Sequence, residues 1–314
     1  MIEVSIIIIN HNEPGLLKEC VVSLVRETKE VSYEVIVIDN GSTVGNIEQS
    51  LSEFPSVKLF KTENNVGFAA ANNLGLKHSV GRYLLFLNND TLFTQNVIKK
   101  VIDFAEKLNN PFFVSCQLLN ANRTKQETVT KFPSVWNGFT ENFFLYKLFP
   151  KSRMFNKYYQ NNIELTKPTE VDVIRGAFMF CSADAVRKLN GFDERFFFYS
   201  EETDLCYRFT KNGGRIFFMP DVSIIHYGGV TTDKNLWFKF RNQTIGKIQF
   251  YQKHFRGIRF AAALFFHFAG LLMRGILFTV SGFISFRKTL SVKGFYFFKQ
   301  MTVYPKNSFK QDKS

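Results

Sequence analysis

Strand-length apolar segments that recur between helix-like segments are the feature that most constrains the fold. Residues 83–87 (Tyr-Leu-Leu-Phe-Leu) contain no strongly polar side chain, and residues 4–9 are similarly apolar. Residues 33–38 are a further strand-like segment, rich in Val and Ile. Continuous apolar runs of this length are typical of strands buried on both faces of a sheet. Residues 16–28 and 69–78 have helical spacing between them. Because strand and helix alternate as in βαβ units, we predict an α/β fold with a Rossmann-like, mostly parallel sheet flanked by helices.

Polar residues stand where three of these strands end. Asn10, Asp39 and Asp90 follow apolar runs directly or within a short polar segment. Each one alone is more often a turn former. The carboxyl ends of parallel strands meet at one edge, where α/β proteins bind ligands, so the three together predict a binding site. There Asp39 is expected to bond a ribose or base, and Asp90 to hold a hard cation that carries substrate phosphates.

Two common nucleotide-binding motifs are missing. No GxGxxG follows the first strand, and no GxxxxGK[ST] occurs in the chain. These absences argue against a dinucleotide cofactor and against a P-loop. We therefore expect a nucleotide held by side chains and a metal ion.

A second group of acids follows an aromatic segment at residues 196–199. Glu201, Glu202 and Asp204 would lie in the first turn of a helix that starts near Ser200. Acids there favour the helix dipole, which would be a purely structural role. The functional alternative is a general base whose pKa is set by burial and neighbouring charge. His226, at the end of a later strand, is either structural or a nitrogen ligand to the metal at Asp90.

The central segment has weaker patterns. Residues 110–170 show little periodicity, and we assign them to the acceptor side, with residues 139–149 as a short helix or a lid. Residues 171–180 form a strand interrupted by Gly176, which would allow a ligand to approach closely.

The order of the motifs resembles the family 2 glycosyltransferases of the GT-A fold, and most closely a bacterial rhamnosyltransferase-like branch that builds surface polysaccharides. The resemblance covers about residues 3–232. It is carried by Ser5–Asn12, Val37–Ser42, Asn65–Phe68, Leu87–Thr91, Gly191–Glu194, Glu201–Cys206 and His226–Gly229. It implies inverting transfer of a sugar from a dTDP- or UDP-linked donor to a hydroxyl of a glycan or lipid-linked glycan, usually with Mg²⁺ or Mn²⁺.

The resemblance also implies roles for individual residues. Glu202 matches the catalytic base, and Asp204 would orient the acceptor or the base. Asp90 matches the metal-binding acid, and His226 matches a further metal ligand. Asn10 and Asp39 would contact the base and ribose, and Asn65 and Asn73 the diphosphate. The full set of expected nucleotide-binding residues is Asn10, Asp39, Asn40, Asn65, Gly67, Asn73 and Asn89.

Two departures from the family pattern matter. Asn88-Asn89-Asp90 stands where the family has Asp-x-Asp, which leaves one carboxylate for the cation. Glu202 is one methylene longer than the usual Asp. A catalytically inactive nucleotide-sugar-binding or scaffold relative therefore stays open as an alternative. A sugar nucleotidyltransferase is a weaker one, because a Gly-rich, Arg-containing loop after the first strand is missing.

The net charge of +13 is confined to the last quarter of the chain. Residues 1–234 contain 26 basic and 26 acidic residues, whereas residues 235–314 contain 14 basic residues and one acid, Asp312. This change predicts a boundary near Asp233. We expect a catalytic domain over 1–232, with a nucleotide-binding half over about 1–95 and an acceptor half over about 96–232, and a helical, basic extension over 233–314.

Residues 256–288 contain two apolar runs divided by Arg274. Each run is too short to span a bilayer, and a single span would bury Arg274 near its centre. On one helix, an arc of about 80° would collect the polar and small residues. These are Arg256, Arg259, His267, Gly270, Arg274, Ser281, Ser285 and Lys288. The pattern predicts a helix in the membrane interface with its bases at anionic headgroups.

The same helix could instead pack on the catalytic domain, which is the structural alternative to a membrane position. A nucleic-acid site is disfavoured, because the aromatic residues are mostly Phe on the apolar side and do not alternate with Arg. A membrane-surface position would suit a lipid-linked acceptor.

The location of the protein is expected to be cytoplasmic, peripheral on the inner face of the cell membrane. No basic segment precedes an apolar run at the start of the sequence, so no secretory signal is indicated. The four cysteines lie far apart, which indicates isolated thiols in a reducing compartment and neither a zinc site nor a disulfide framework.

Overall fold

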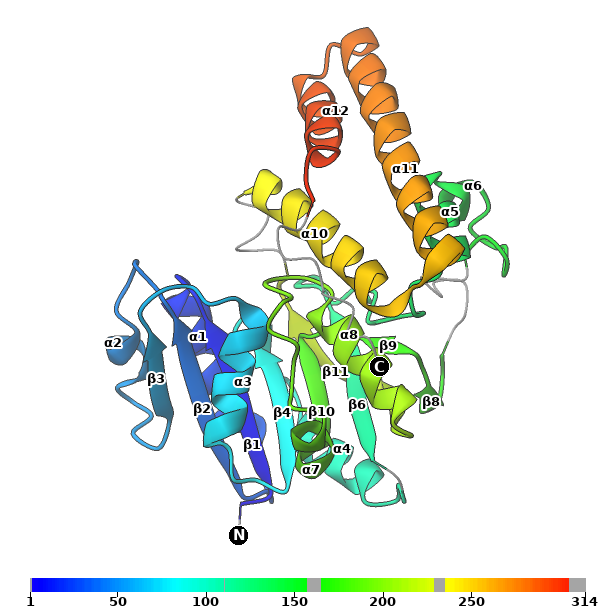
Figure 1. Ribbon diagram of the computed structural model, residues 1–314. Coiled ribbons are helices and arrows are strands. Elements are labelled where there is room, and N and C mark those ends of the chain that lie inside the picture. Colours follow the sequence, from blue (N-terminus) through cyan, green and yellow to red (C-terminus); the bar gives the residue numbers. More distant parts are fainter. Residues whose placement is uncertain (1, 110, 157–164, 229–234, 305–314) are drawn as a thin grey trace. The chain divides into compact units, whose positions relative to one another are not determined.

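The computed structural model describes residues 2–109, 111–156, 165–228 and 235–304 (Figure 1). It divides into two units. Unit 1 comprises Met1–Thr130, Glu164–Phe197 and Glu201–Thr231, and unit 2 comprises Lys131–Ile163, Phe198–Ser200 and Thr232–Ser314. A single boundary near Asp233, which lies outside the described residues, does not describe this division, because two earlier segments belong with the C-terminal part.

Unit 1 is built on a mixed sheet with the strand order β3-β2-β1-β4-β10-β6-β11-β5, and β8 also pairs with β11. The β1–β2, β2–β3, β1–β4 and β6–β11 pairs are parallel, and the pairs that involve β10, β5 and β8 are antiparallel. The strands are β1 (Val4–Asn10), β2 (Tyr33–Asn40), β3 (Lys58–Thr62), β4 (Tyr83–Asn88), β5 (Thr91–Leu92), β6 (Phe112–Leu119), β8 (Thr169–Glu170), β10 (Phe178–Ser182) and β11 (Arg215–His226). A small second sheet pairs β7 (Val129–Thr130) with β9 (Val173–Ile174).

Helices cover both faces of this sheet. They are α1 (Pro14–Glu27), α2 (Ile47–Leu51), α3 (Phe68–His78), α4 (Val97–Ala105), α7 (Ala183–Lys188) and α8 (Glu201–Lys211). Ile6 and Ile8 share a core cluster with residues of α1 and α4. Ile7 points the other way, toward α3, where a Cβ on Gly75 would lie 2.3 Å from the Ile7 side chain. The predicted α/β fold with helices on both faces is confirmed.

The register of the strands places their carboxyl ends together. Asn10 pairs with Asp39 across β1 and β2, and Ile9 pairs with Asn88 across β1 and β4. The polar residues that end these three strands therefore lie at one edge of the sheet, as the apolar runs predicted. This edge positions the candidate site.

Unit 2 is helical in its described residues. Its helices are α5 (Val135–Asn142), α6 (Leu145–Leu148), α10 (Leu236–His254), α11 (Gly257–Ile284) and α12 (Lys288–Gln300). The segment 139–149, expected as a short helix or a lid, contains the end of α5 and the whole of α6. The helix expected over 256–288 is broken, because α11 ends at Ile284 and Lys288 starts α12.

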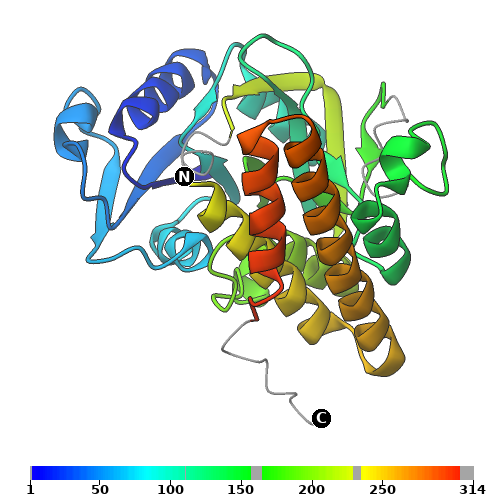
Figure 2. The ribbon, with the colours of Figure 1, turned by 90° about the horizontal axis from the view of Figure 1, so that it is seen from above.

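α11 and α12 lie side by side as a helical hairpin (Figures 1 and 2). Glycines let the two helices approach closely. A Cβ on Gly282 would lie 2.3 Å from the Ser291 hydroxyl, and one on Gly294 would lie 2.7 Å from the backbone nitrogen of Thr279. By length and composition α11 is apolar and long enough to cross a bilayer.

The polar arc predicted on α11 faces the protein in its central part, which corrects the expectation that Arg274 reaches headgroups. The Arg274 guanidinium donates to the backbone oxygens of Glu141 and Asn142, at the end of α5. His267 is buried, and a Cβ on Gly270 would lie 2.4 Å from Asn142. Arginine suits this position because the last carbonyls of a helix have no partners within the helix.

Candidate active site

The first part of the site joins the ends of β1, β2 and β4 in unit 1. The Asn10 amide donates to the carboxylate of Asp39 over 3.5 Å and to the hydroxyl of Ser42 over 3.3 Å. Asn89 in turn donates to the Asn10 side-chain oxygen over 2.8 Å. Asn10 and Asp39 are both buried. The structure therefore brings together Asn10, Asp39 and Asn89, which the sequence assigned to the nucleotide.

A turn before α3 continues this cluster. The Asn40 amide donates to Asn65 and to the backbone oxygen of Gly67, and its oxygen accepts from the backbone N–H of Val66. Gly67 has a φ of 90°, and a Cβ there would lie 2.6 Å from the backbone oxygen of Phe197. Glycine is needed here for both its conformation and its size. Asn40, Asn65 and Gly67 thus form one bonded turn at the same edge.

The hydrogen bonds of Asn73 join it to the loop at residues 192–194, and not to this cluster. Its amide nitrogen donates to the backbone oxygen of Phe192 and to Glu194, and its oxygen accepts from the backbone N–H of Phe192. These bonds fix the 191–194 loop against α3. Both ends of the amide are therefore used in structure, and contact between Asn73 and a diphosphate stays a prediction.

Asp90 and His226 come together where β4 ends and β11 ends. One Asp90 carboxylate oxygen accepts from the backbone N–H of Gly228, and the other, Oδ1, lies 3.4 Å from His226 Nε2. The pairing of β5 with β11 sets Thr91 opposite His226 and so fixes this approach. Gly229, the last residue of the His226–Gly229 motif, lies outside the described residues.

Gln126 was not found by sequence reasoning. Its side-chain oxygen lies 2.9 Å from His226 Nδ1, and its amide nitrogen donates to the His226 backbone oxygen. With Nδ1 as the donor, Nε2 keeps its lone pair toward Asp90, and the Asn88 amide lies 3.3 Å from it. The assignment of the proton follows from this hydrogen-bond pattern. Gln126 lies in a segment without periodicity, so no local pattern indicated it.

These residues fit a divalent cation in part. Asp90 Oδ1 is buried and makes no hydrogen bond to any described residue. Two adjacent ligands at 2.0–2.1 Å from one Mg²⁺ ion lie roughly 3 Å apart, which is close to the Asp90–His226 separation. No group of three or more His, Cys, Asp or Glu side chains suited to a metal occurs in the described part of the chain. The protein thus offers two ligands, and a substrate diphosphate and water would complete the coordination.

The acidic segment starts α8, as predicted. Glu201 is buried, and burial raises the pKa of its carboxyl well above the usual range, with the charge of Glu202 raising it further. One Glu201 oxygen makes no hydrogen bond within the described residues. Glu202 is half-buried and faces Gly176, where a Cβ would lie 3.9 Å from the Glu202 Cβ and 3.7 Å from the Phe68 ring. Gly176 therefore leaves space beside Glu202.

Asp204 corrects part of the prediction. Its side chain is fully buried and forms an ion pair with Arg208, 2.7 Å from the Arg208 Nε. The same guanidinium donates to the backbone oxygens of Leu189 and Gly191. Because the carboxylate has no exposed surface, it does not reach an acceptor in this structure. Positioning of Glu202 through α8 is the expected role that stays open.

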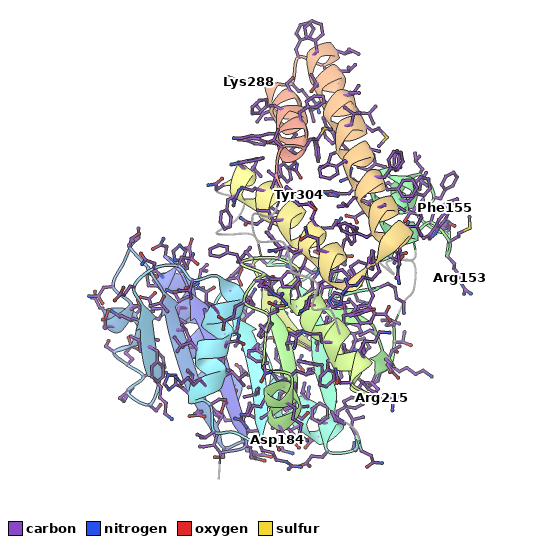
Figure 3. All side chains as sticks on the ribbon, viewed as in Figure 1. Arg153, Phe155, Asp184, Arg215, Lys288 and Tyr304 are labelled. Atoms are coloured by element: carbon purple, nitrogen blue, oxygen red, sulfur yellow. The ribbon has the colours of Figure 1, made fainter. Side chains whose placement is uncertain are left out.

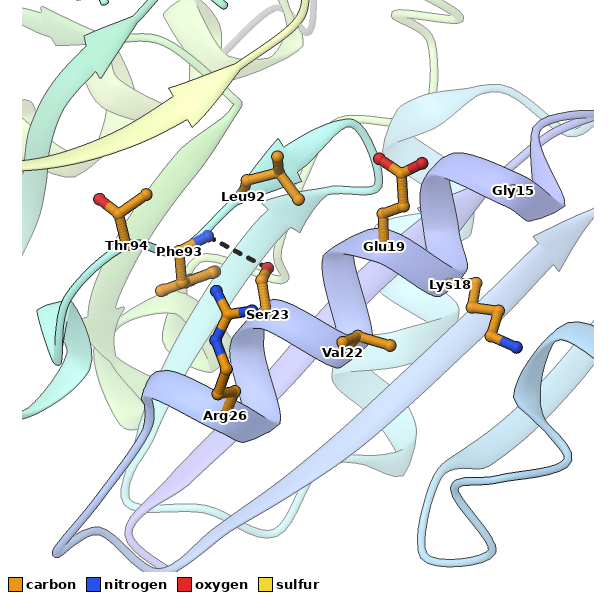
Figure 4. Close-up of a pocket in the computed structure, with 9 residues that line it drawn as sticks. All are labelled: Gly15, Lys18, Glu19, Val22, Ser23, Arg26, Leu92, Phe93 and Thr94. Atoms are coloured by element: carbon orange, nitrogen blue, oxygen red, sulfur yellow. Dashed lines mark hydrogen bonds between the residues drawn. The ribbon is translucent and has the colours of Figure 1, made fainter.

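A shallow cavity of about 510 Å³ lies beside α1 and the segment 92–94 (Figure 4). Its polar side chains are those of Lys18, Glu19, Ser23, Arg26 and Thr94. None of the predicted site residues lines it. The candidate site is therefore defined by the strand-end cluster, and not by this cavity.

Comparison with known proteins places the chain among sugar-transferring enzymes. It is 26% identical to rhamnosyltransferase WbbL of Escherichia coli K12 over 232 residues, which cover 71% of this chain and 83% of that protein. It is 23% identical to the N-acetylglucosaminyl-diphospho-decaprenol L-rhamnosyltransferase of Mycobacterium tuberculosis over 219 residues, 66% of this chain and 70% of that one.

Solved structures share the fold. A mannosyltransferase from Pyrobaculum calidifontis, in complex with GDP-Man and Mn²⁺, matches with a TM-score of 0.57 and 15% identity over 95% of this chain and 85% of that one. GalNAc-T7 with UDP, GalNAc and Mn²⁺ matches with a TM-score of 0.54 and 16% identity over 72% of this chain and 44% of that one. Residues 5–186, more than half of the chain, match the family described as Glycosyl transferase family 2. The chain therefore belongs to glycosyl transferase family 2.

Proposed function

We propose that this glycosyltransferase moves a sugar, with inversion, from a dTDP- or UDP-linked donor to a hydroxyl of a glycan or lipid-linked glycan in bacterial cell-surface polysaccharide synthesis. The observation that carries the proposal is the buried, unbonded Asp90 oxygen beside His226, at the same sheet edge as Asn10 and Asp39. The two rhamnosyltransferase relatives favour a rhamnosyl donor.

Asn10, Asp39, Asn40 and Asn89 would bind the base and ribose. Asn10, Asp39 and Asn89 are already joined by hydrogen bonds, and Asn40 bonds Asn65, so a nucleoside would exchange existing hydrogen bonds for its own. Such exchange without a large rearrangement is typical of pre-formed ligand sites. Gly67 and Asn65 would lie toward the phosphates, in the turn where Asn40 and Asn65 accept hydrogen bonds from the backbone N–H groups of Val66 and Gly67.

Asp90 and His226 would hold Mg²⁺ or Mn²⁺. Bound there, the cation would stabilise the negative charge that develops on the leaving diphosphate. Gln126 would orient His226 so that Nε2 stays available as a ligand.

Glu202 would act as the general base. An acceptor hydroxyl is a poor nucleophile at neutral pH, so Glu202 takes its proton while the oxygen attacks the anomeric carbon. The new bond forms on the face opposite the departing diphosphate oxygen, which takes the electron pair of the broken bond, and the configuration inverts. Burial and the charge of Glu202 raise the pKa of Glu201, which disfavours a second negative charge beside Glu202.

The basic C-terminal part would attach the enzyme to the inner face of the cell membrane, where a lipid-linked acceptor is available. Its excess of 13 positive charges favours anionic lipids. The acceptor in the printed name of the mycobacterial relative, a decaprenol diphosphate carrying N-acetylglucosamine, is of this lipid-linked class.

Two measurements test the proposal. The first measures the melting temperature with UDP, dTDP or GDP, each with Mn²⁺, Mg²⁺ or EDTA. Only one pyrimidine diphosphate, together with the metal, should raise the melting temperature. Sugar transfer should then fall by at least about 100-fold in Glu202→Gln. The matched control is Asp184→Asn, an exposed acid on α7, which should retain activity. Full activity of Glu202→Gln would remove that residue as the base. Nucleotide binding without hydrolysis or transfer would favour the inactive relative.

A further inference from the structure

We propose that one face of α11, together with the turn that follows it, inserts into the hydrocarbon boundary of an anionic bilayer, with the helix lying in the membrane plane. This inference rests on the proposed membrane attachment. It goes further, because it assigns the binding to a defined apolar surface in addition to the basic charge.

The surface is a row of exposed apolar residues that we call the outer stripe. It consists of Ile258, Phe265, Leu272, Ile276, Val280 and Phe283. At 100° per residue these positions fall within an arc of about 80°, and at 1.5 Å per residue they extend over about 38 Å. Ile258 is 86% exposed and Phe283 is 80% exposed. Phe286, in the turn before α12, is 94% exposed. Exposed apolar surface of this extent marks an interaction site.

The opposite side of α11 carries its polar groups inward. Arg274 bonds the end of α5, and His267 is buried. Gly275 packs against Phe298 of α12, where a Cβ would lie 2.7 Å from the Phe298 ring. In its central part α11 thus turns Arg274, His267 and Gly270 toward α5 and exposes large apolar residues. A helix that covers its polar face with protein and leaves its apolar face open is suited to an apolar solvent on that face.

Charge around the outer stripe matches an anionic lipid surface. Between residues 260 and 286 the one charged side chain is Arg274, which faces α5. Exposed bases stand at both ends of the stripe, with Arg256 and Arg259 on either side of its first residue, Ile258, and Arg287 and Lys288 after its last. Figure 3 shows side chains projecting outward along α11 and labels Lys288 at the turn. Bases at the ends would meet headgroup phosphates while the stripe meets acyl chains.

The packing of α11 favours an orientation in the membrane plane over a crossing. Aromatic residues of α5 pack against Phe266, and Glu141 and Asn142 of α5 lie at the middle of α11. A crossing helix would carry these polar groups into the hydrocarbon centre, which is costly. In the plane, the outer stripe enters the membrane while α5 and α12 stay on the water side of α11.

A second copy of the chain is a poorer occupant of the stripe. Residues 235–314 carry a net charge of +13, so pairing two such surfaces would bring like charges together. An anionic bilayer instead neutralises the same charge. We therefore infer that a lipid surface, and not a second copy of the chain, covers the outer stripe.

Vesicle cosedimentation of the full chain tests the inference. The probes are phosphatidylcholine vesicles and vesicles with equimolar phosphatidylglycerol. Wild-type protein should bind the anionic vesicles, and Phe283→Ser/Phe286→Ser should bind them at least about 10-fold more weakly, because two exposed aromatic side chains no longer enter the acyl region. The matched control Val80→Ser removes an apolar side chain that is 65% exposed in unit 1 and should bind like wild type. Far-UV circular dichroism would verify that each variant is folded.

A depth measurement separates insertion from surface contact. Phe283→Trp, made in a Trp136→Phe/Trp237→Phe background, should be quenched by lipids brominated on their acyl chains, whereas Leu148→Trp in the same background should not. If the fluorescence of Phe283→Trp is not quenched, insertion is overturned and charge-driven attachment remains. The same conclusion follows if the serine variant binds the vesicles like wild type and salt releases both proteins. No binding to any vesicle would overturn both. A dimer that the serine variant abolishes would assign the stripe to a second copy. Transfer to a water-soluble acceptor tests the catalytic proposal separately.

Discussion

The buried histidine of unit 2 makes a quantitative prediction about acid sensitivity. His267 is 4% exposed, and neither ring nitrogen has a hydrogen-bond partner among the described residues. Burial lowers the pKa of the imidazole to about 3; the charges of Lys247 and Arg274 lower it as well, and only Glu141 raises it. In the unfolded chain a histidine has a pKa of about 6.5. The folded state therefore excludes a proton that the unfolded state binds.

The sign and size of the effect follow from this difference. Because the unfolded state binds more protons below pH 6.5, stability falls as pH falls from about 6.5 toward about 3. A solution at pH 5 lies about 1.5 pH units below the pKa of the unfolded histidine, and each unit corresponds to about 1.36 kcal/mol of free energy. His267 should therefore cost about 2 kcal/mol of folding stability at pH 5 relative to pH 7.5 or above.

The assay compares wild type with His267→Leu by urea unfolding at pH 7.5 and at pH 5. Leucine has a similar volume and does not titrate, so the variant should gain about 2 kcal/mol over wild type on going from pH 7.5 to pH 5. The difference between the two proteins cancels the other titrating groups. His254→Gln, at the partly exposed end of α10, is the matched control. If the difference in the free energy of unfolding between wild type and His267→Leu is the same at both pH values, a buried, neutral His267 is refuted.

Three further predictions concern unit 1. Burial raises the pKa of Glu201, so the stability of the wild type should fall as pH rises above about 4.5. In thermal melts, the melting temperature of Glu201→Gln should therefore rise relative to that of the wild type between pH 5 and pH 8, and a constant difference between the two would contradict the raised pKa. Gln126→Leu should weaken Mn²⁺ affinity about 10- to 100-fold in calorimetry with UDP present, because His226 loses its orienting partner, and unchanged affinity would separate His226 from the metal. Gly67→Ala should destabilise the protein by more than about 1 kcal/mol in urea unfolding, since its φ is 90° and its Cβ would meet Phe197; a neutral substitution would show that the turn relaxes.

The sequence alone determined the strand ends and their common edge. Apolar runs such as 83–87 make buried strands, and parallel pairing then forces Asn10 and Asp39 side by side. This inference needs only the local sequence pattern and the rule that parallel strands end at one edge. The observed pairing of Asn10 with Asp39 confirms it. The start of α8 at the acidic segment was confirmed for the same reason, because local side chains decide where a helix begins.

Tertiary structure decided which side chains are available for function. Gln126 meets His226 across 100 residues of sequence, and Arg208 draws Asp204 into a buried pair anchored on the loop at Gly191. No local pattern specifies such partners. The helix of residues 257–284 shows the same limit. Its periodicity identified a polar arc and an apolar face, but the packing of α5 and α12 decided that the arc with Arg274 turns inward and the apolar face stays open. The reason is physical: periodicity defines the faces of a helix, and only the neighbours that bury one face determine which of them meets the solvent.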